Sequence, residues 1–158
     1  MARTTPATQA LVKAGVAFEL VAYDYDPGDQ RVGLQAAEAI GESPARVFKT
    51  LMMEADGKPV CVLIPSDREA SLKKVAAHFG AKHAAMMTPA AAERLTGYHV
   101  GGISALGQRR RVPTAVDASA LGFETVFVNG GQRGLQAKLA PADLLRALDA
   151  RAADLLGK

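Results

Sequence analysis

The chain carries the stretch Val47-Phe48-Lys49-Thr50-Leu51-Met52-Met53, followed after Ala55-Asp56-Gly57-Lys58 by a second apolar run over residues 60–64. Two apolar runs joined through Asp-Gly are typical of a β-hairpin, although a four-residue connection is longer than the two-residue loop of a type I′ turn. The stretch therefore predicts two antiparallel strands in the middle of the chain. Cys61 lies in the second run, where we expect a small buried thiol.

Capping residues and apolar spacing predict further helices and strands on both sides of this hairpin. Thr5 and Pro6 are typical of a helix start, as are Thr88 and Pro89. Helices are expected over residues 6–14, 33–40, 71–79 and 89–96, and from Pro141 with an apolar stripe of Leu144, Leu145, Leu148 and Leu155. Strands are expected over residues 16–23, 84–87, 112–117, 125–128 and 135–139.

This order of elements has no regular βαβ rhythm and predicts an α/β protein of the mixed α+β kind. We expect a single compact domain over residues 1–158, with a curved, barrel-like sheet that is mixed but largely antiparallel and is flanked by helices. No linker rich in Ser, Gly or Pro divides the chain, and 158 residues are enough for one sizeable core.

Composition points to a soluble protein of a reducing compartment. The net charge of +3 and the pI of about 9.2 permit a polyanionic partner but do not demand one. A single cysteine excludes an internal disulfide framework, and neither a secretory leader nor a membrane-spanning run is visible. We therefore expect a cytoplasmic protein that does not bind membranes.

Lys49 is the first candidate for chemistry, because its charge interrupts an apolar strand and shares a face with Leu51 and Met53. An ammonium in such a place needs a partner, a ligand or an opening to solvent. The functional interpretation is a ligand contact. The structural interpretation is an edge-strand lysine whose head reaches water.

Two glycine-rich segments are candidate ligand loops. Residues 97–113 hold Gly101 and Gly102 among four glycines, and they end in three consecutive arginines, Arg109, Arg110 and Arg111. That run could follow phosphates or could be a solvated edge, and its side chains alternate in direction if the segment is extended. Arg133 lies between glycines of the second segment, either as an anion contact or as a solvated turn residue.

Familiar catalytic and metal-binding motifs are missing from the sequence. His78 and His83 are five positions apart, and there is no His-Glu-x-x-His and no cysteine pair, so no metal is expected. Neither a Gly-x-Ser-x-Gly elbow nor a phosphate-binding Walker loop is present. His99 is a lone histidine, which is more often structural than a general base.

In combination, several motifs resemble the YbaK/EbsC family of trans-editing aminoacyl-tRNA deacylases, and most closely its Cys-tRNA(Pro) branch. The resemblance covers nearly the whole chain. It rests on the motifs Thr5-Pro6, Tyr23 with Asp26-Pro27, Val47 to Leu51, Leu72 to Ala76, Thr96-Gly97-Tyr98, Gly101 to Ser104 and Gly130 to Leu135.

The resemblance implies a compact mixed fold, no cofactor, and hydrolysis of the ester that joins a mischarged amino acid to tRNA. It implies catalytic roles for Lys49, Gly101 and Gly102. The implied substrate-binding positions are Tyr23, Thr50, Tyr98, Ile103, Ser104, Asn129, Arg133 and Gln136. Arg109, Arg110 and Arg111 are the expected tRNA contacts, with mischarged tRNA(Pro) as the partner and a prolyl-tRNA synthetase as a second one.

The family pattern also implies a mechanism without a protein base. In the cysteine-specific branch, the cysteinyl thiol attacks its own ester, and the protein supplies orientation and electrostatics. Two alternatives remain open: a deacylase that removes alanine or another small amino acid with water, and a non-catalytic tRNA-binding module. The chain departs from the family pattern at Ala105, Tyr25, Gln136 and Asn129, and these positions bear on specificity.

Overall fold

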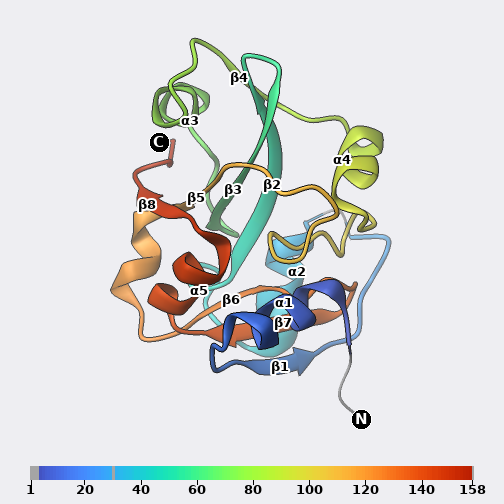
Figure 1. The fold of residues 1–158 in the computed structure, drawn as a ribbon. Helices are drawn as coiled ribbons and strands as arrows, with labels where there is room; N and C mark the ends of the chain where they lie inside the picture. The colour runs from blue at the N-terminus through green and yellow to red at the C-terminus, as the bar shows by residue number, and fades with distance from the viewer. Residues whose placement is uncertain (1–3, 30, 158) are drawn as a thin grey trace.

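The computed structural model describes residues 4–29 and 31–157, and the expected hairpin lies at its centre (Figure 1). Strand β2 (Phe48–Ala55) pairs with β3 (Lys58–Pro65) in antiparallel register, with Ala55 opposite Lys58. The turn is thus only two residues long, and Asp56 and Gly57 both have positive φ, 50° and 79°. This is the type I′ geometry that Asp-Gly favours, so the hairpin is confirmed and the expected four-residue connection is wrong.

The strands form two separate sheets. The first has the order β1-β7-β6 and is antiparallel throughout: β1 (Glu19–Ala22), β7 (Leu135–Leu139) and β6 (Val126–Asn129). The second has the order β4-β2-β3-β5-β8, where β4 (Ala84–Met86) is antiparallel to β2, and β5 (Thr114–Asp117) and β8 (Arg151–Ala153) continue β3 in parallel.

The mixed α/β class and the largely antiparallel pairing are confirmed, whereas the barrel-like closure is wrong. Among residues 4–29 and 31–157, one isolated parallel bridge, between Val47 and Phe127, is the only backbone pairing that joins the two sheets. Each sheet keeps two edge strands, so no ring of hydrogen bonds closes. Figure 1 shows the three-stranded sheet at one end of the molecule and the long β2–β3 hairpin rising away from it.

The helices are α1 (Pro6–Ala14), α2 (Val32–Ile40), α3 (Leu72–His78), α4 (Pro89–Thr96) and α5 (Pro141–Leu148), with a short 3₁₀ turn over Ala118–Gly122. Helices α1, α4 and α5 begin at the expected prolines, α3 follows Ser71, and α2 begins at Val32, one residue before the expected start. The Thr5 and Thr88 side chains accept hydrogen bonds from the backbone N–H groups of Thr8 and Ala91. None of the helices in residues 4–29 and 31–157 is long and apolar enough to span a membrane.

The last helix is shorter than expected. It ends at Leu148, and Asp149 turns the chain with a φ of 50° into β8, a strand that the sequence pattern did not predict. Leu155 therefore does not extend the helical stripe but lies fully buried against the five-stranded sheet, where its N–H donates to Asp117 at 3.0 Å. The short β8 pairs only with β5, so no local alternation announced it.

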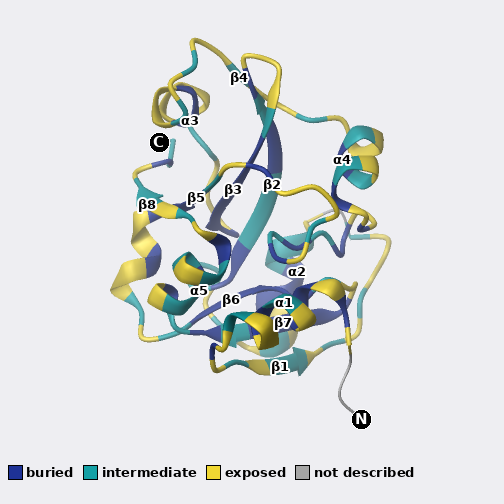
Figure 2. Cartoon of the chain, in the orientation of Figure 1, coloured by how far each residue is buried: buried dark blue, intermediate teal, exposed yellow. Residues whose placement is uncertain are grey.

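Burial follows this layout, with the inner strands buried and the outer helix faces exposed (Figure 2). The main core lies between the hairpin, the three-stranded sheet and helices α1 and α5, and includes Leu11, Phe48, Leu63, Val128 and Leu144. A second core joins the other face of the hairpin to α3 through Met53, Ile64 and Val75. With both faces covered, the hairpin is a rigid base for whatever lies along its edge.

Candidate functional site

A pocket of about 510 Å³ opens beside the edge of β2 that faces away from β3. Strand β4 pairs with β2 only from Met53 to Ala55, and the bridge to β6 is at Val47. Between these two points no strand of the described chain covers the edge of β2, and this gap is where the pocket lies. Its other walls come from the start of α2, the glycine turn at Gly101, and the facing ends of β6 and β7.

Lys49 lines this pocket and is half-buried. Burial lowers the pKa of its ammonium, and the negative charges of Glu69 and Asp67 offset only part of that effect. In the part of the chain that the structure describes, no carboxylate lies within ion-pair distance of it. The ammonium is therefore available to a ligand, as the functional interpretation of this residue requires.

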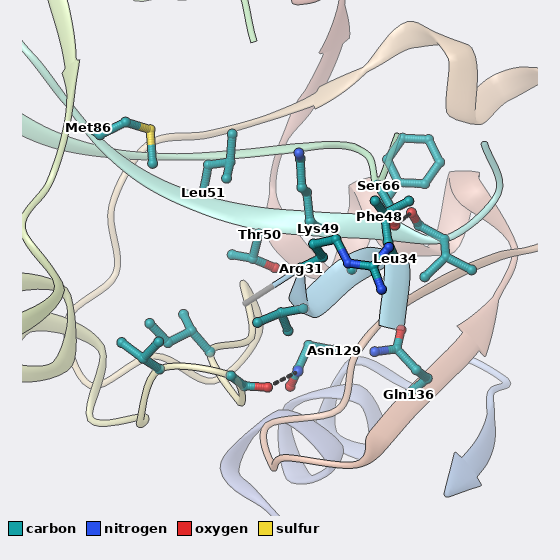
Figure 3. A pocket seen from close by; sticks show the side chains of 16 residues that line it. Arg31, Leu34, Phe48, Lys49, Thr50, Leu51, Ser66, Met86, Asn129 and Gln136 are labelled. Carbon is teal, nitrogen blue, oxygen red and sulfur yellow. Dashed lines mark hydrogen bonds between the residues drawn. The ribbon is translucent and has the colours of Figure 1, made fainter. Parts of the chain in front are cut away.

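Thr50 reaches the pocket from the other side of β2. Figure 3 shows Lys49 and Leu51 pointing to one side of the strand and Thr50 to the other, toward Asn129. The pocket thus wraps around the strand edge and has a cationic side and a neutral polar side. The start of α2 packs tightly on the cationic side, since a Cβ on Gly33 would lie 2.8 Å from the Ser66 hydroxyl and 3.3 Å from the Lys49 Cβ.

The two glycines of the first loop have different environments. Gly102 donates its N–H to the His99 carbonyl at 2.8 Å, and Gly101, with φ +93°, occupies the position of that turn which requires positive φ. Gly101 lines the pocket, and its N–H has no partner within residues 4–29 and 31–157. Gly102 instead packs against the second glycine loop, because a Cβ on Gly102 would lie 2.7 Å from the backbone nitrogen of Arg133.

Asn129 and Arg133 fasten this turn. The Asn129 amide donates to the Gly101 carbonyl at 3.3 Å, and its oxygen accepts the Gly131 N–H at 2.7 Å. Arg133 donates from Nε to the Val100 carbonyl at 2.9 Å, and its guanidinium lies 5.5 Å from the centre of the Tyr25 ring. The Tyr25 hydroxyl in turn fills the space that a Gly101 side chain would need. Arg133, Tyr25 and the Val100–Gly101 turn form one assembly, which we call the latch.

Three polar side chains near the neutral side are incompletely paired. Gln136 is 3% exposed and lines the pocket beside its strand partner Asn129. The Tyr23 hydroxyl, the Thr50 hydroxyl and the Gln136 carboxamide oxygen are buried and have no hydrogen-bond partner in the described chain. Burial raises the pKa of Tyr23, and the nearby Gln136 amide offsets part of that rise.

The pocket brings together six of the eleven catalytic and substrate-binding positions named from the sequence: Lys49, Thr50, Gly101, Ile103, Asn129 and Gln136. Tyr98 lies in the main core, with its hydroxyl donating to the Leu106 carbonyl at 2.6 Å. Ser104 is fully buried and accepts the Leu106 N–H. The remaining three positions do not line the pocket: Tyr23, Gly102 and Arg133.

Other candidates lie elsewhere. Arg109, Arg110 and Arg111 are exposed on the chain before β5 and do not line the pocket. His99 is 84% exposed and 3.8 Å from Glu93. Cys61 is fully buried, as expected, and burial raises the pKa of its thiol to about 12. The described residues contain no cluster of three His, Cys, Asp or Glu side chains that could hold a metal ion.

Several pocket residues were not identified from the sequence. Arg31, Val32 and Gly33 arrive with the start of α2, and Ser66 with the end of β3. Arg31 pairs with Asp29 at 3.0 Å and gave only the signal of a polar loop residue. The packing of α2 against the strand edge brings residues 31–33 to Lys49, and that contact has no local sequence signature.

Comparison with known proteins identifies the kind of domain to which this pocket belongs. The family described as "Aminoacyl-tRNA editing domain" matches residues 33–147. A protein of Enterococcus faecalis named "Putative Cys-tRNA(Pro)/Cys-tRNA(Cys) deacylase EbsC" is 34% identical over 123 residues, which are 77% of this chain and 75% of that protein. The proline–tRNA ligase of Moorella thermoacetica is 29% identical over 117 residues, 67% of this chain and 20% of the ligase.

The fold agrees with these relatives. A solved structure titled "Crystal structure of a putative trans-editing enzyme for prolyl tRNA synthetase" superposes with a TM-score of 0.84, at 24% identity, over 99% of this chain and 100% of that one.

Proposed function

Because this chain belongs to the aminoacyl-tRNA editing family, we propose that it cleaves the ester of mischarged tRNA in trans, with Cys-tRNA(Pro) as its substrate. The observation that carries the proposal is the pocket itself, where an unpaired ammonium and an unpaired backbone N–H line one space of about 510 Å³. Such a space suits a small amino acid with the terminal nucleoside. The whole of residues 1–158 then acts as one editing domain, since β1 pairs with β7 and α1 packs in the same core as α5.

Ester cleavage places negative charge on the carbonyl oxygen, and Gly101 is the donor available to stabilise it. One such backbone donor contributes roughly 2.7–4 kcal/mol in other hydrolases. The Gly102 N–H is engaged in the turn, so its role is to hold Gly101 in position. Lys49, on the other side of the strand edge, neutralises the terminal phosphate or polarises the ester.

The nucleophile is the thiol of the substrate cysteine. Its sulfur attacks the ester carbon, the bond from that carbon to the ribose oxygen breaks, and the thiol proton passes to that oxygen. The product is a cyclic thioester, which water opens to free cysteine. Two features support this route: the amide side chain of Gln136 in the pocket cannot act as a base, and the buried Cys61 does not line the pocket.

The test is deacylation of Cys-tRNA(Pro), Ala-tRNA(Pro) and Pro-tRNA(Pro) side by side at equal protein concentration. We expect rapid loss of cysteine, slow loss of alanine and no loss of proline. Faster cleavage of alanyl-tRNA would assign the chain to the water-using deacylases. Binding of all three without turnover would make it a tRNA-binding accessory. A prolyl-tRNA synthetase is the proposed partner, since similar domains form part of proline–tRNA ligases.

A further inference from the structure

The side chains of the three arginines before β5 do not all lie on the same surface. The side chain of Arg109 packs beside Gly97, whose added Cβ would lie 3.4 Å from the Arg109 Nε. Arg110 and Arg111 instead line a groove of about 380 Å³ together with Lys58 at the hairpin turn. The apolar residues Val60, Phe79 and Val112 also line this groove.

Arg111 also belongs to a second hollow. That hollow has a volume of about 310 Å³ and lies against α1 and α5, with Lys13 on its opposite wall. Since Arg111 and Val112 line both hollows, the two adjoin. The two adjoining hollows are therefore lined by four cations, Lys13, Lys58, Arg110 and Arg111, which we call the basic band.

No residue of the basic band forms an ion pair within the described chain, although the charge of Lys58 contributes to the lowered pKa of Asp56 beside it at the hairpin turn. The ion pairs within residues 4–29 and 31–157 involve Arg31, Arg46, Lys74, His99, Lys138 and Arg146, and none of the four band residues. All four side chains are exposed. Exposed cations without ion-pair partners repel one another. A ligand that presents several negative charges therefore gives such a surface the largest gain in electrostatic energy.

The basic band is separate from the pocket of Lys49 but joined to it by one segment. The two hollows share no lining residue with the pocket. The segment that carries Gly101 and Ile103 into the pocket continues through residues 105–108 of the second hollow to Arg110. Nine residues separate Gly101 from Arg110, which limits their separation to about 30 Å.

We propose that the basic band is the surface that binds the phosphate backbone of the tRNA acceptor arm while the 3′ end reaches the pocket. The inference rests on the proposed function and adds Lys13 and Lys58 as contacts. Arg109 is not one of them. Backbone phosphates are successive anions along the strand, and the basic band offers several exposed cations on two adjoining hollows, so the contact is independent of base sequence.

The experiment compares two variants with the same net charge. The band variant carries Lys13→Gln, Lys58→Gln, Arg110→Gln and Arg111→Gln. The control carries Lys73→Gln, Lys82→Gln, Arg94→Gln and Arg146→Gln, four exposed cations outside both hollows. Uncharged tRNA(Pro) is titrated against each protein over a range of salt concentrations. With about 0.7–0.9 lost per phosphate contact, the slope of log K against log[salt] should fall by about 3 in the band variant and remain near wild type in the control.

A second readout separates this inference from the proposed function. Cysteinyl-CCA, a trinucleotide ester without an acceptor stem, should be cleaved by the band variant at the wild-type rate. If wild-type protein cleaves no aminoacyl ester, the proposed function fails. If it cleaves them but the band and control variants bind tRNA with the same slope, the basic band is not the RNA surface. Arg109→Gln should leave the salt slope unchanged. If this single substitution lowered the slope as much as the band variant does, the assignment would also be overturned.

Discussion

At the scale of the residue, the half-buried position of Lys49 lowers the free energy of unfolding. Burial lowers the pKa of its ammonium, so keeping this group charged costs the folded state some stability relative to the unfolded chain. Lys49→Met keeps the length of the side chain and removes the charge. We expect a variant that is at least as resistant to urea as wild type and that loses turnover by about 10²-fold or more.

The pH dependence gives the sign of this effect. Between the lowered folded pKa and the unfolded value near 10.4, the unfolded chain binds more protons, so wild-type stability rises with pH. The advantage of Lys49→Met should therefore shrink as pH approaches that value. Urea titrations at several pH values measure it, and a variant that is less stable than wild type at neutral pH would show that the ammonium has a stabilising partner.

Gly101 tests the backbone donor at the same scale. Its φ of +93° disfavours any side chain, and a Cβ would collide with the Tyr25 hydroxyl. Gly101→Ala keeps this N–H but forces the turn away from the Tyr25 hydroxyl, so the donor moves. We expect kcat to fall by as much as roughly 10²–10³, the effect of losing one oxyanion donor. Gly122→Ala is the matched control, because a Cβ at Gly122 meets nothing within 4 Å. Similar kcat values for the two variants would remove Gly101 from the chemistry.

At the scale of the element, the latch affects catalysis by holding the Val100–Gly101 turn in position. Arg133 does not line the pocket but holds the Val100 carbonyl from Nε, with the Tyr25 ring beside its guanidinium. Arg133→Lys keeps the charge and loses the planar donor. We expect kcat to fall by about 10- to 100-fold with KM little changed, since the turn shifts while the pocket walls stay.

Two variants identify the cause of that loss. Tyr25→Phe keeps the ring against the guanidinium and should retain most of the activity, whereas Tyr25→Ala should resemble Arg133→Lys. Arg146→Lys, on the outer face of α5, is the control for the substitution itself. A rise in KM with normal kcat would mean that Arg133 contacts the substrate directly.

Elements with local signals were predictable, and those defined by distant contacts were not. Thr5-Pro6 and Thr88-Pro89 located two helix starts, and Asp56-Gly57 located the hairpin, because each acts through its own backbone. Leu155 matched the helical spacing by coincidence. Asp149 turns the chain before it, and the three-residue β8 forms only because β5 offers an edge.

At the scale of the whole molecule, the same distinction explains the site. Lys49 was identifiable as a charge in an apolar strand, and the glycine pair as a loop. Arg31 and Ser66 were not, because the pocket exists only where β2 lacks a neighbour between Val47 and Met53. Pairing of β4 starts too late to cover that edge, and the missing barrel closure leaves it open. This gap results from how distant strands pair, so no single segment of the sequence predicts it.

The arrangement of the whole pocket also leads to a prediction about which molecule supplies the nucleophile. Its polar groups are an ammonium, a guanidinium, two hydroxyls, two amides and a backbone N–H, with His99 exposed outside it and Cys61 buried away from it. None of these is a positioned base for water, whereas a substrate thiol is a strong nucleophile held next to its own ester. We therefore expect Cys-tRNA(Pro) to be cleaved much faster than Ser-tRNA(Pro), although the two side chains are nearly the same size, and Cys61→Ser to retain activity.

The decisive substrate is S-methylcysteinyl-tRNA(Pro), which blocks the sulfur with one added carbon. Cleavage should fall to the rate measured with alanyl-tRNA, while the affinity of the protein for the tRNA stays the same. Catalytically dead Lys49→Met serves to measure that affinity without turnover, if binding of the cysteinyl and S-methylcysteinyl forms is compared on the same variant. Equal cleavage of the two forms by wild type would mean that water attacks, and the alanine-type mechanism would then replace the thiol-assisted one.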